Sequence, residues 1–166
     1  MSGEPFPKAS QLARGDSERV TERHLLELVR RRYSTRDGNG PRWALATHVR
    51  DRAGFDATRT LDAVVMDTWP SSGLALHGLE IKCSRGDWLR ELASPEKAAA
   101  FTCRVDYFWI VAPSAVVRSN ELPEHWGLLE ARGYALRVAV QAGRLADSLP
   151  LDRSFVAALL RAACRS

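Results

Sequence analysis

Lysine is the scarce charged residue of this sequence. Only Lys8, Lys82 and Lys97 occur among 24 basic residues, so the other 21 are arginines. A lysine ammonium is a compact point charge with tunable proton and water contacts, whereas a guanidinium is a rigid planar fork. A lysine kept at position 82 therefore suggests a chemical role, although three lysines can also be distributed by chance.

Several other features are missing, and each absence excludes a class of protein. The three cysteines, Cys83, Cys103 and Cys164, are odd in number and far apart, which argues against a disulfide framework or a zinc site. No apolar run is long enough for a signal peptide or a membrane span. Internal repeats, a P-loop and a glycine-rich dinucleotide fingerprint are also absent. We expect a cytoplasmic protein with reduced thiols and no membrane partner.

Length and composition fit one domain. The chain has 166 residues, of which 45% are hydrophobic, and this is enough for one substantial core. Residues 1–16 are polar and contain glycine, proline and serine. They predict a flexible tail, followed by a single domain over residues 17–166.

The middle of the chain predicts a strand, a helix and a second strand. Residues 78–83 alternate charged and apolar side chains, and Ser84 is a good N-cap with Asp87 three residues later. The run from Tyr107 to Val111 is continuously apolar, as in a buried strand. This order is typical of a crossover between parallel strands, with the helix covering the sheet.

The flanking segments complete an α/β pattern. We expect a first helix over residues 17–33, strands over residues 43–49 and 60–65, and a hairpin of residues 126–130 with 135–140. A last helix would be capped by Asp152 or Ser154.

Asp62, Glu80 and Lys82 are the candidate chemical centre. In a strand, Glu80 and Lys82 project to one side while Leu79 and Ile81 project to the other. Two carboxylates and an ammonium on neighbouring strands would form an oxygen-rich Mg²⁺ pocket beside a lysine that orients water or neutralises phosphate. The alternative is that Asp62 ends a strand and that the other two are a solvated strand face.

Glu22 is a candidate supporting acid on the first helix. At helical spacing it falls on the same side as Leu25 and Leu26, where a carboxylate needs a partner or a cation. Glu18 lies on the same face and is the alternative candidate. A third interpretation is that Glu22 occupies the first helical turn, which favours acids in any case.

Positive charge is concentrated early in the chain. Residues 1–60 hold 12 basic and 8 acidic residues, whereas residues 61–166 hold 12 of each. Such clustering suits contact with a phosphate backbone, although arginines at a helix C-terminus also complement the helix dipole. The candidate nucleic-acid-binding residues are Arg30, Arg31, Arg32, Arg42 and Arg59.

Together these residues resemble the PD-(D/E)XK, or restriction-endonuclease-like, nuclease superfamily. Asp62 and the run Glu80-Ile81-Lys82 match its acid and its Glu-x-Lys signature, and residues 21–26 are similar to the acidic first helix of Holliday-junction-resolvase-like members. A closer resemblance is to MmcB-like proteins assigned to DNA repair, over segments like residues 82–89 and 107–111. The likeness spans residues 17–141.

The resemblance implies a fold, a cofactor and a partner. The fold is a core of one helix, three strands, a helix and a strand, with a mixed central sheet flanked by helices; here a C-terminal hairpin and helix would follow. Asp62 and Glu80 would hold Mg²⁺, with Mn²⁺ as a substitute and the Ile81 carbonyl as a third ligand. Lys82 would act on the attacking water or the developing charge, Glu22 would support the site, and DNA would be the substrate.

We therefore expect a Mg²⁺-dependent nuclease acting in DNA repair or recombination. One alternative is a catalytically silent DNA-binding module with the nuclease fold, and another is a protein-interaction domain. The sequence leaves the preferred DNA or RNA structure open. It also leaves open a homodimer, which the resolution of a junction would require.

Overall fold

Six strands form a mixed sheet in the computed structural model, which describes residues 20–34, 36–37, 40–146 and 148–166. Their order follows the chain from β3 to β8. The pairs β5–β6 and β6–β7 are parallel, and the other neighbours are antiparallel. The strands are β3 (Trp43–Arg50), β4 (Thr60–Asp67), β5 (Leu76–Ile81), β6 (Tyr107–Pro113), β7 (Gly127–Arg132) and β8 (Ala135–Val140); a small ribbon pairs β1 (Arg36–Asp37) with β2 (Gly40–Pro41).

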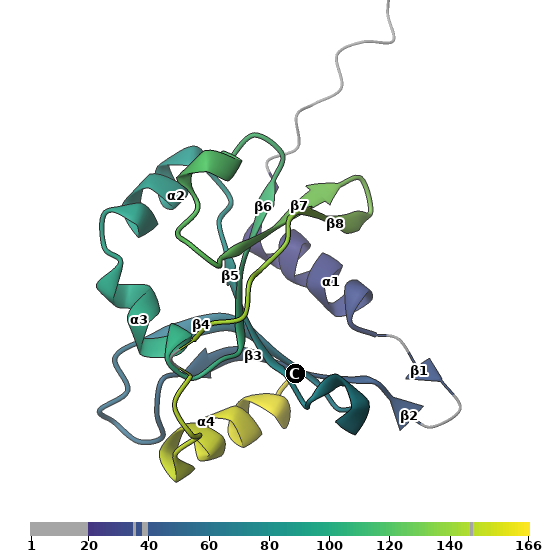
Figure 1. Cartoon of the computed structure of the whole chain (residues 1–166), viewed down its shortest axis with the longest axis vertical. Coiled ribbons are helices and arrows are strands. Elements are labelled where there is room, and N and C mark those ends of the chain that lie inside the picture. Colours follow the sequence, from purple (N-terminus) through teal and green to yellow (C-terminus); the bar gives the residue numbers. More distant parts are fainter. Residues whose placement is uncertain (1–19, 35, 38–39, 147) are drawn as a thin grey trace, which may run out of the picture.

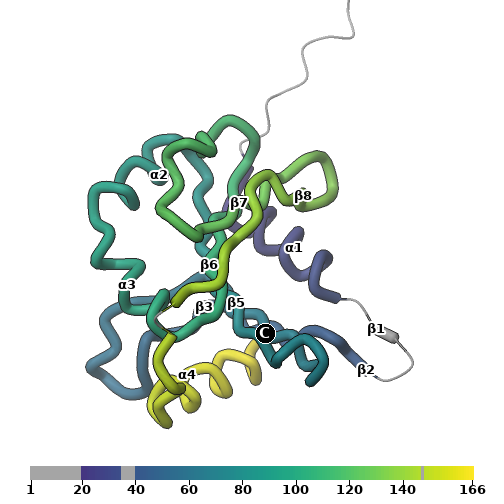
Figure 2. The backbone as a smooth tube through the Cα atoms, in the orientation of Figure 1, coloured from purple at the N-terminus to yellow at the C-terminus, as the bar shows by residue number. Residues whose placement is uncertain are grey.

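Helices cover both faces of this sheet, as Figures 1 and 2 show. α1 (Glu22–Arg32) packs on one face, and the other three α-helices of the described part pack on the opposite face. These are α2 (Arg85–Leu92), α3 (Glu96–Thr102) and α4 (Arg153–Ala163), and two short 3-10 helices are η1 (Pro70–Ser72) and η2 (Ser119–Glu121). The predicted α/β class is confirmed.

Two apolar layers hold these elements together. On the α1 face, Leu25 and Val29 are fully buried against the sheet, and on the other face Trp88 of α2 and Phe155 of α4 are fully buried. The run in β6 lies between the layers, which explains its continuous apolar sequence.

The predicted crossover is confirmed. β5 and β6 are parallel, and α2 and α3 lie between them in the chain. The Ser84 hydroxyl accepts a hydrogen bond from the backbone N–H of Asp87 and so starts α2 directly after β5. The hairpin of β7 and β8 and the last helix are also confirmed, with Asp152 accepting from the backbone N–H of Phe155 as the N-cap.

The first helix is shorter than the predicted range of residues 17–33. It begins at Glu22, because Thr21 is extended and its hydroxyl accepts from the backbone N–H of His24, which caps the helix. The predicted tail (residues 1–16), the first residues of the predicted helix and the alternative acid Glu18 lie outside the described residues. No helix in the described part is long and apolar enough to cross a membrane, and all three cysteines are free thiols.

Candidate functional site

Asp62 and Glu80 lie where two antiparallel strands part. The ladder of β4 and β5 ends with Ala63 opposite Leu79, and Asp62 and Glu80 are the next positions beyond that pair. Asp62 Oδ2 accepts a hydrogen bond of 2.6 Å from the backbone N–H of Ile81. The carboxylate therefore bonds a backbone group of β5 just beyond the ladder, which fixes its position.

Lys82 follows β5 directly and is held by two carboxylates. Its Nζ donates to Glu80 Oε1 and to Glu91 Oε2, both at 2.8 Å. The side chains of Lys82, Glu80 and Glu91 are only 10%, 19% and 11% exposed, so water screens these ion pairs poorly. The alternative interpretation, in which Glu80 and Lys82 form a solvated strand face, is wrong because both side chains are largely buried.

Glu91 is a member of this cluster that the sequence analysis missed. It comes from the last turn of α2, three residues after the fully buried Trp88. Residues three apart share a helix face, so Glu91 points toward the sheet and reaches Lys82. The spacing from Trp88 was the sequence signal that could have identified it.

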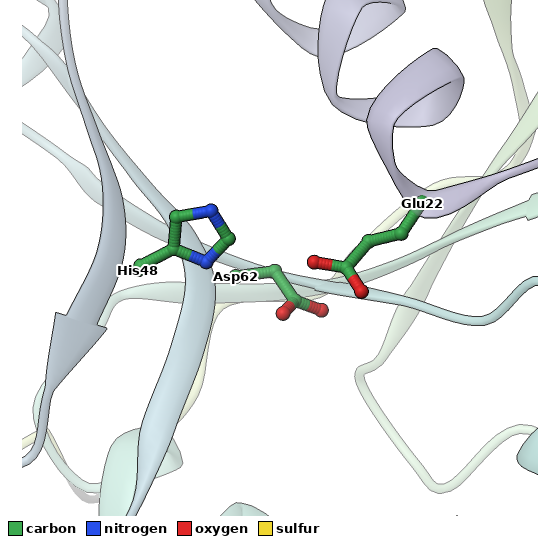
Figure 3. A group of neighbouring side chains, drawn as sticks. All are labelled: Glu22, His48 and Asp62. Carbon is green, nitrogen blue, oxygen red and sulfur yellow. The ribbon is translucent and has the colours of Figure 1, made fainter.

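Glu22, His48 and Asp62 form a second cluster beside the first. Each offers one ligand atom, and these atoms all lie within 4.8 Å of one another. Figure 3 shows the Asp62 carboxylate between the His48 imidazole and the Glu22 carboxylate, which extends from the first turn of α1. Glu22 is exposed, as expected for a first helical turn, and its side chain nevertheless turns to the strands.

His48 reaches this cluster because of strand register. Thr47 pairs with Ala63 and Val49 with Leu61, so His48 lies across from Asp62. Its φ angle is 52°, in the left-handed region, although it lies within a strand. For a residue with a Cβ this conformation costs about 1–2 kcal/mol. Spacing along the sequence gave His48 no role, because only the pairing of β3 with β4 brings it to Asp62.

Members of both clusters line one pocket of about 350 Å³, and His48 is the one member that does not belong to the lining. Asp62, Glu80 and Lys82 contribute to its wall, together with Glu22 and Glu91. Ile81, Cys83, Asp87, Arg90 and Lys97 complete the lining. The structure thus brings the four predicted catalytic residues to one pocket, but groups Asp62 with Glu22 and His48 and pairs Glu80 with Lys82.

Burial and charge change the acid strengths in this pocket. Burial, with the nearby Asp62 carboxylate, raises the pKa of Glu80 to about 7. Burial also raises the pKa of Asp62. Burial alone would lower the pKa of the Lys82 ammonium, but the carboxylates of Glu80 and Glu91 outweigh it and raise that pKa. Lys82 is therefore a cation at neutral pH and not a proton acceptor.

Three of the predicted DNA-binding arginines lie in the last turn of α1. Arg31 Nη1 donates to the Tyr134 carbonyl oxygen at 3.2 Å, and Arg32 Nη1 donates to the Leu136 carbonyl oxygen at 3.1 Å. These bonds tie α1 to the hairpin of β7 and β8. Arg30 is exposed. All three lie about 12–15 Å along the helix axis from Glu22, at the other end of α1.

The other two predicted arginines lie at opposite ends of β4. Arg42 Nη2 bonds Asp67 Oδ2 at 2.8 Å, and Asp67 is five residues from Asp62, which is about 17 Å along a strand. Arg59, by contrast, precedes β4 at the Asp62 end and lines a second pocket with Glu80. Of the five arginines, Arg59 is the one that the structure places beside the acids.

Glu22, His48 and Asp62 fit a divalent metal ion. Ligand atoms on one such ion lie about 2.0–2.2 Å from it, so they can be at most about 4.4 Å apart. The ligand atoms of this cluster lie within 4.8 Å of one another, slightly above that value. A small side-chain movement would bring them within about 4.4 Å. Two carboxylates and an imidazole are also a chemically suitable donor set.

Comparisons with known proteins bear on the fold. No family model matches this chain, and no curated protein matches it. Among solved structures the chain is similar to "SPO1766 protein of unknown function from Silicibacter pomeroyi", with a TM-score of 0.54 and 16% identity over 85% of this chain and 82% of that chain. At this identity the similarity establishes a shared α/β fold alone.

Proposed function

We propose that this protein is a metal-dependent nuclease that hydrolyses phosphodiester bonds of DNA. One observation carries the proposal: a single pocket contains the acids Glu22, Asp62 and Glu80 beside the buried ammonium of Lys82. Hydrolysis of a phosphodiester builds negative charge on its oxygens, and a metal ion next to a fixed ammonium stabilises that charge. The superfamily resemblance of Asp62, Glu80 and Lys82 supports the same function.

Glu22, His48 and Asp62 are the proposed metal ligands. Divalent ions differ in their preferred ligands: Mg²⁺ takes oxygen ligands, whereas other ions also accept imidazole nitrogen. With one imidazole among two carboxylates, Mn²⁺ is expected to bind at least as well as Mg²⁺. Glu80 and the Ile81 carbonyl remain proposed additional ligands, and Glu80 would first have to release Lys82.

Lys82 and Glu91 have separate proposed roles. In the reaction a water oxygen bonds to phosphorus and the water gives up one proton to solvent. The bond from phosphorus to one ester oxygen breaks, and that oxygen leaves with a proton taken from solvent. The Lys82 ammonium would donate hydrogen bonds to the charged phosphoryl oxygens. Glu91 is a positioning residue, because it would keep Lys82 in place when Glu80 turns to the metal.

A DNA-binding module that does not cleave is the second candidate. It is favoured by the ion pair between Lys82 and Glu80, which occupies both groups and leaves Glu80 outside the cluster of Glu22, His48 and Asp62. Such a module would bind DNA with an affinity that falls steeply with salt.

Cleavage assays on labelled duplex, single-stranded, flap and junction DNA, with Mg²⁺ or Mn²⁺, test the proposal. The parent should cut at least one substrate, and Asp62→Asn should abolish cutting because it removes a charged ligand. Lys82→Arg should be nearly inactive, because the larger planar guanidinium does not fit the place of the ammonium.

The matched control is Glu124→Gln, since Glu124 is 89% exposed and outside the pocket lining. It should cut as well as the parent. If the parent binds DNA but never cuts it with either ion, the binding module is the better description. If Lys82→Arg cuts as well as the parent, the proposed role of Lys82 is wrong.

A further inference from the structure

Phe55 is the most exposed large apolar side chain in the described residues. Its relative exposure is 105%, against 80% for Tyr134 and 62% for Leu160. Single exposed apolar residues are common and need no explanation by themselves. Phe55 differs because its loop is held in one conformation and borders the candidate site.

The loop that joins β3 to β4 is fixed by its own hydrogen bonds. Asp51 is only 2% exposed, and its carboxylate accepts from the backbone N–H and the hydroxyl of Thr58. Arg50 donates to the carbonyl oxygens of Gly54 and Ala57. Gly54 has a φ of 99°, which turns the chain directly before Phe55. The ring is therefore presented to solvent by an ordered turn.

A contact to another element anchors the loop as well. The backbone N–H of Ala53 donates to the hydroxyl and the carbonyl oxygen of Ser154, at 3.0 and 3.2 Å, at the start of α4. A side chain on a pre-ordered loop can bind a partner without the loss of conformational entropy that ordering a flexible loop would require. Phe55 thus has the properties of a binding residue.

The same loop continues into the candidate site. Thr58, Arg59 and Thr60 line a pocket of about 170 Å³, and its lining also includes Glu80, Glu91 and Lys97. Figure 2 shows the loop between β3 and β4 beside α3, the helix that carries Lys97. Lys97 also lines the larger pocket with Asp62. A continuous path therefore runs from the acids to the base of the loop.

Basic residues outnumber acidic ones among the accessible charges of this loop. Arg50 and Arg52 are exposed and Arg59 is partly exposed, against one exposed acid, Asp56, while Asp51 is buried and hydrogen-bonded within the loop. An exposed aromatic ring on a loop with an excess of arginines matches the way in which proteins bind single-stranded nucleic acid, with bases stacked on rings and phosphates on basic side chains. An apolar protein partner would not require these charges.

We propose that Phe55 stacks on an unpaired base of single-stranded DNA whose phosphates contact Arg59 and Lys97. This inference rests on the proposed nuclease function and names its substrate class as a single strand or a single-stranded extension. A base within a duplex is already stacked on its neighbours and offers no open face to a protruding ring.

Binding of a fluorescein-labelled single-stranded 20-mer, followed by anisotropy in EDTA, tests the inference without cleavage. Phe55→Ala should weaken binding about 5- to 150-fold, the range expected for loss of one stacked base. Phe55→Trp should keep the affinity of the parent. The matched control is Tyr134→Ala, which truncates an exposed aromatic side chain in the turn between β7 and β8 and should leave the affinity unchanged.

A strand that contains 2-aminopurine gives a second readout. Its fluorescence should be quenched on binding to the parent and to Phe55→Trp, and less quenched by Phe55→Ala. Equal affinities of the parent and Phe55→Ala would overturn the inference, as would an absence of any binding by the parent. A dimer that dissociates in Phe55→Ala would also overturn it, because Phe55 would then pack against a second copy. Phe55-dependent binding without cleavage under any metal condition would contradict the nuclease function alone.

Discussion

At the scale of single residues, Lys82 is defined by the two carboxylates that hold its ammonium. Glu80 and Glu91 keep it charged and fix its place, although it is nearly buried. A buried ion pair that loses one partner leaves an uncompensated charge. Each of these acids therefore affects the charge and the position of Lys82. Glu91 can be tested separately, because it is not a proposed metal ligand.

We predict that Glu91→Gln lowers kcat for DNA cleavage roughly 10- to 100-fold, because a misplaced Lys82 loses alignment with the phosphate. Glutamine keeps the shape and one acceptor oxygen but removes the charge. Manganese affinity, measured by calorimetry, should change little, and Glu96→Gln on the exposed start of α3 is the control. An unchanged kcat in Glu91→Gln would show that Glu91 does not position Lys82.

His48 combines backbone strain with the proposed ligand role. At the positive φ of position 48, glycine is unstrained, whereas alanine has the same backbone strain as histidine because it also carries a Cβ. We predict that His48→Gly has a free energy of unfolding about 1 kcal/mol larger than that of His48→Ala, as measured by urea denaturation without metal.

Both His48 variants should bind Mn²⁺ more weakly than the parent, and to a similar extent, because both lack the imidazole. Manganese titrations of the two proteins provide this comparison. Parent-like affinity in either variant would remove His48 from the metal site. Equal stability of the two variants would show that the strain at position 48 is negligible.

At the scale of elements, the pairing of β4 with β5 and the immediate start of α2 build the site. The alternation of Glu80 and Lys82 and the Ser84 cap were visible in the sequence, because both depend on neighbouring residues. The cluster of Glu22, His48 and Asp62 was only partly visible. His48 joins it through the register of β3 with β4, and such register depends on residues far apart in the chain.

An ion pair holds α2 against the segment of η2. The Arg85 guanidinium donates two hydrogen bonds of 2.5 Å to the Glu121 carboxylate, which also accepts from Trp88 Nε1 at 3.1 Å. The bonds from Arg85, chiefly, lower the pKa of Glu121 from 4.5 to about 2. A carboxyl group whose pKa is lower in the folded than in the unfolded state stabilises the fold fully when the pH is above the unfolded-state pKa. This contribution is lost as the pH falls through the folded-state pKa.

We therefore predict that Glu121→Gln is less stable than the parent, by a constant difference in the free energy of unfolding above about pH 5. The difference should shrink between pH 4.5 and 2, where the parent carboxylate becomes protonated. Urea denaturation of both proteins across this range is the measurement. A difference that stays constant down to pH 2 would mean that Glu121 contributes by packing and not by charge.

At the scale of the whole molecule, the arginines that cluster in the sequence do not form one basic surface in the folded protein. The arginines of the first 60 residues suggested one basic surface, but Arg31 and Arg32 bond the hairpin of β7 and β8, and Arg42 bonds Asp67. Composition could not show this, because the partners come from later segments. The α/β class was predictable because each element carries its own local pattern, and the structural similarity to a protein of unknown function concerns this fold alone.

The most direct test of a metal-dependent site is the anomalous diffraction of a crystal soaked in Mn²⁺. We predict a manganese peak about 2.0–2.3 Å from carboxylate oxygens of Glu22 and Asp62 and from an imidazole nitrogen of His48, with Lys82 in the same pocket. The absence of manganese from this cluster at saturating concentration, or its binding only elsewhere on the protein, would contradict the proposed metal centre and the nuclease mechanism that depends on it.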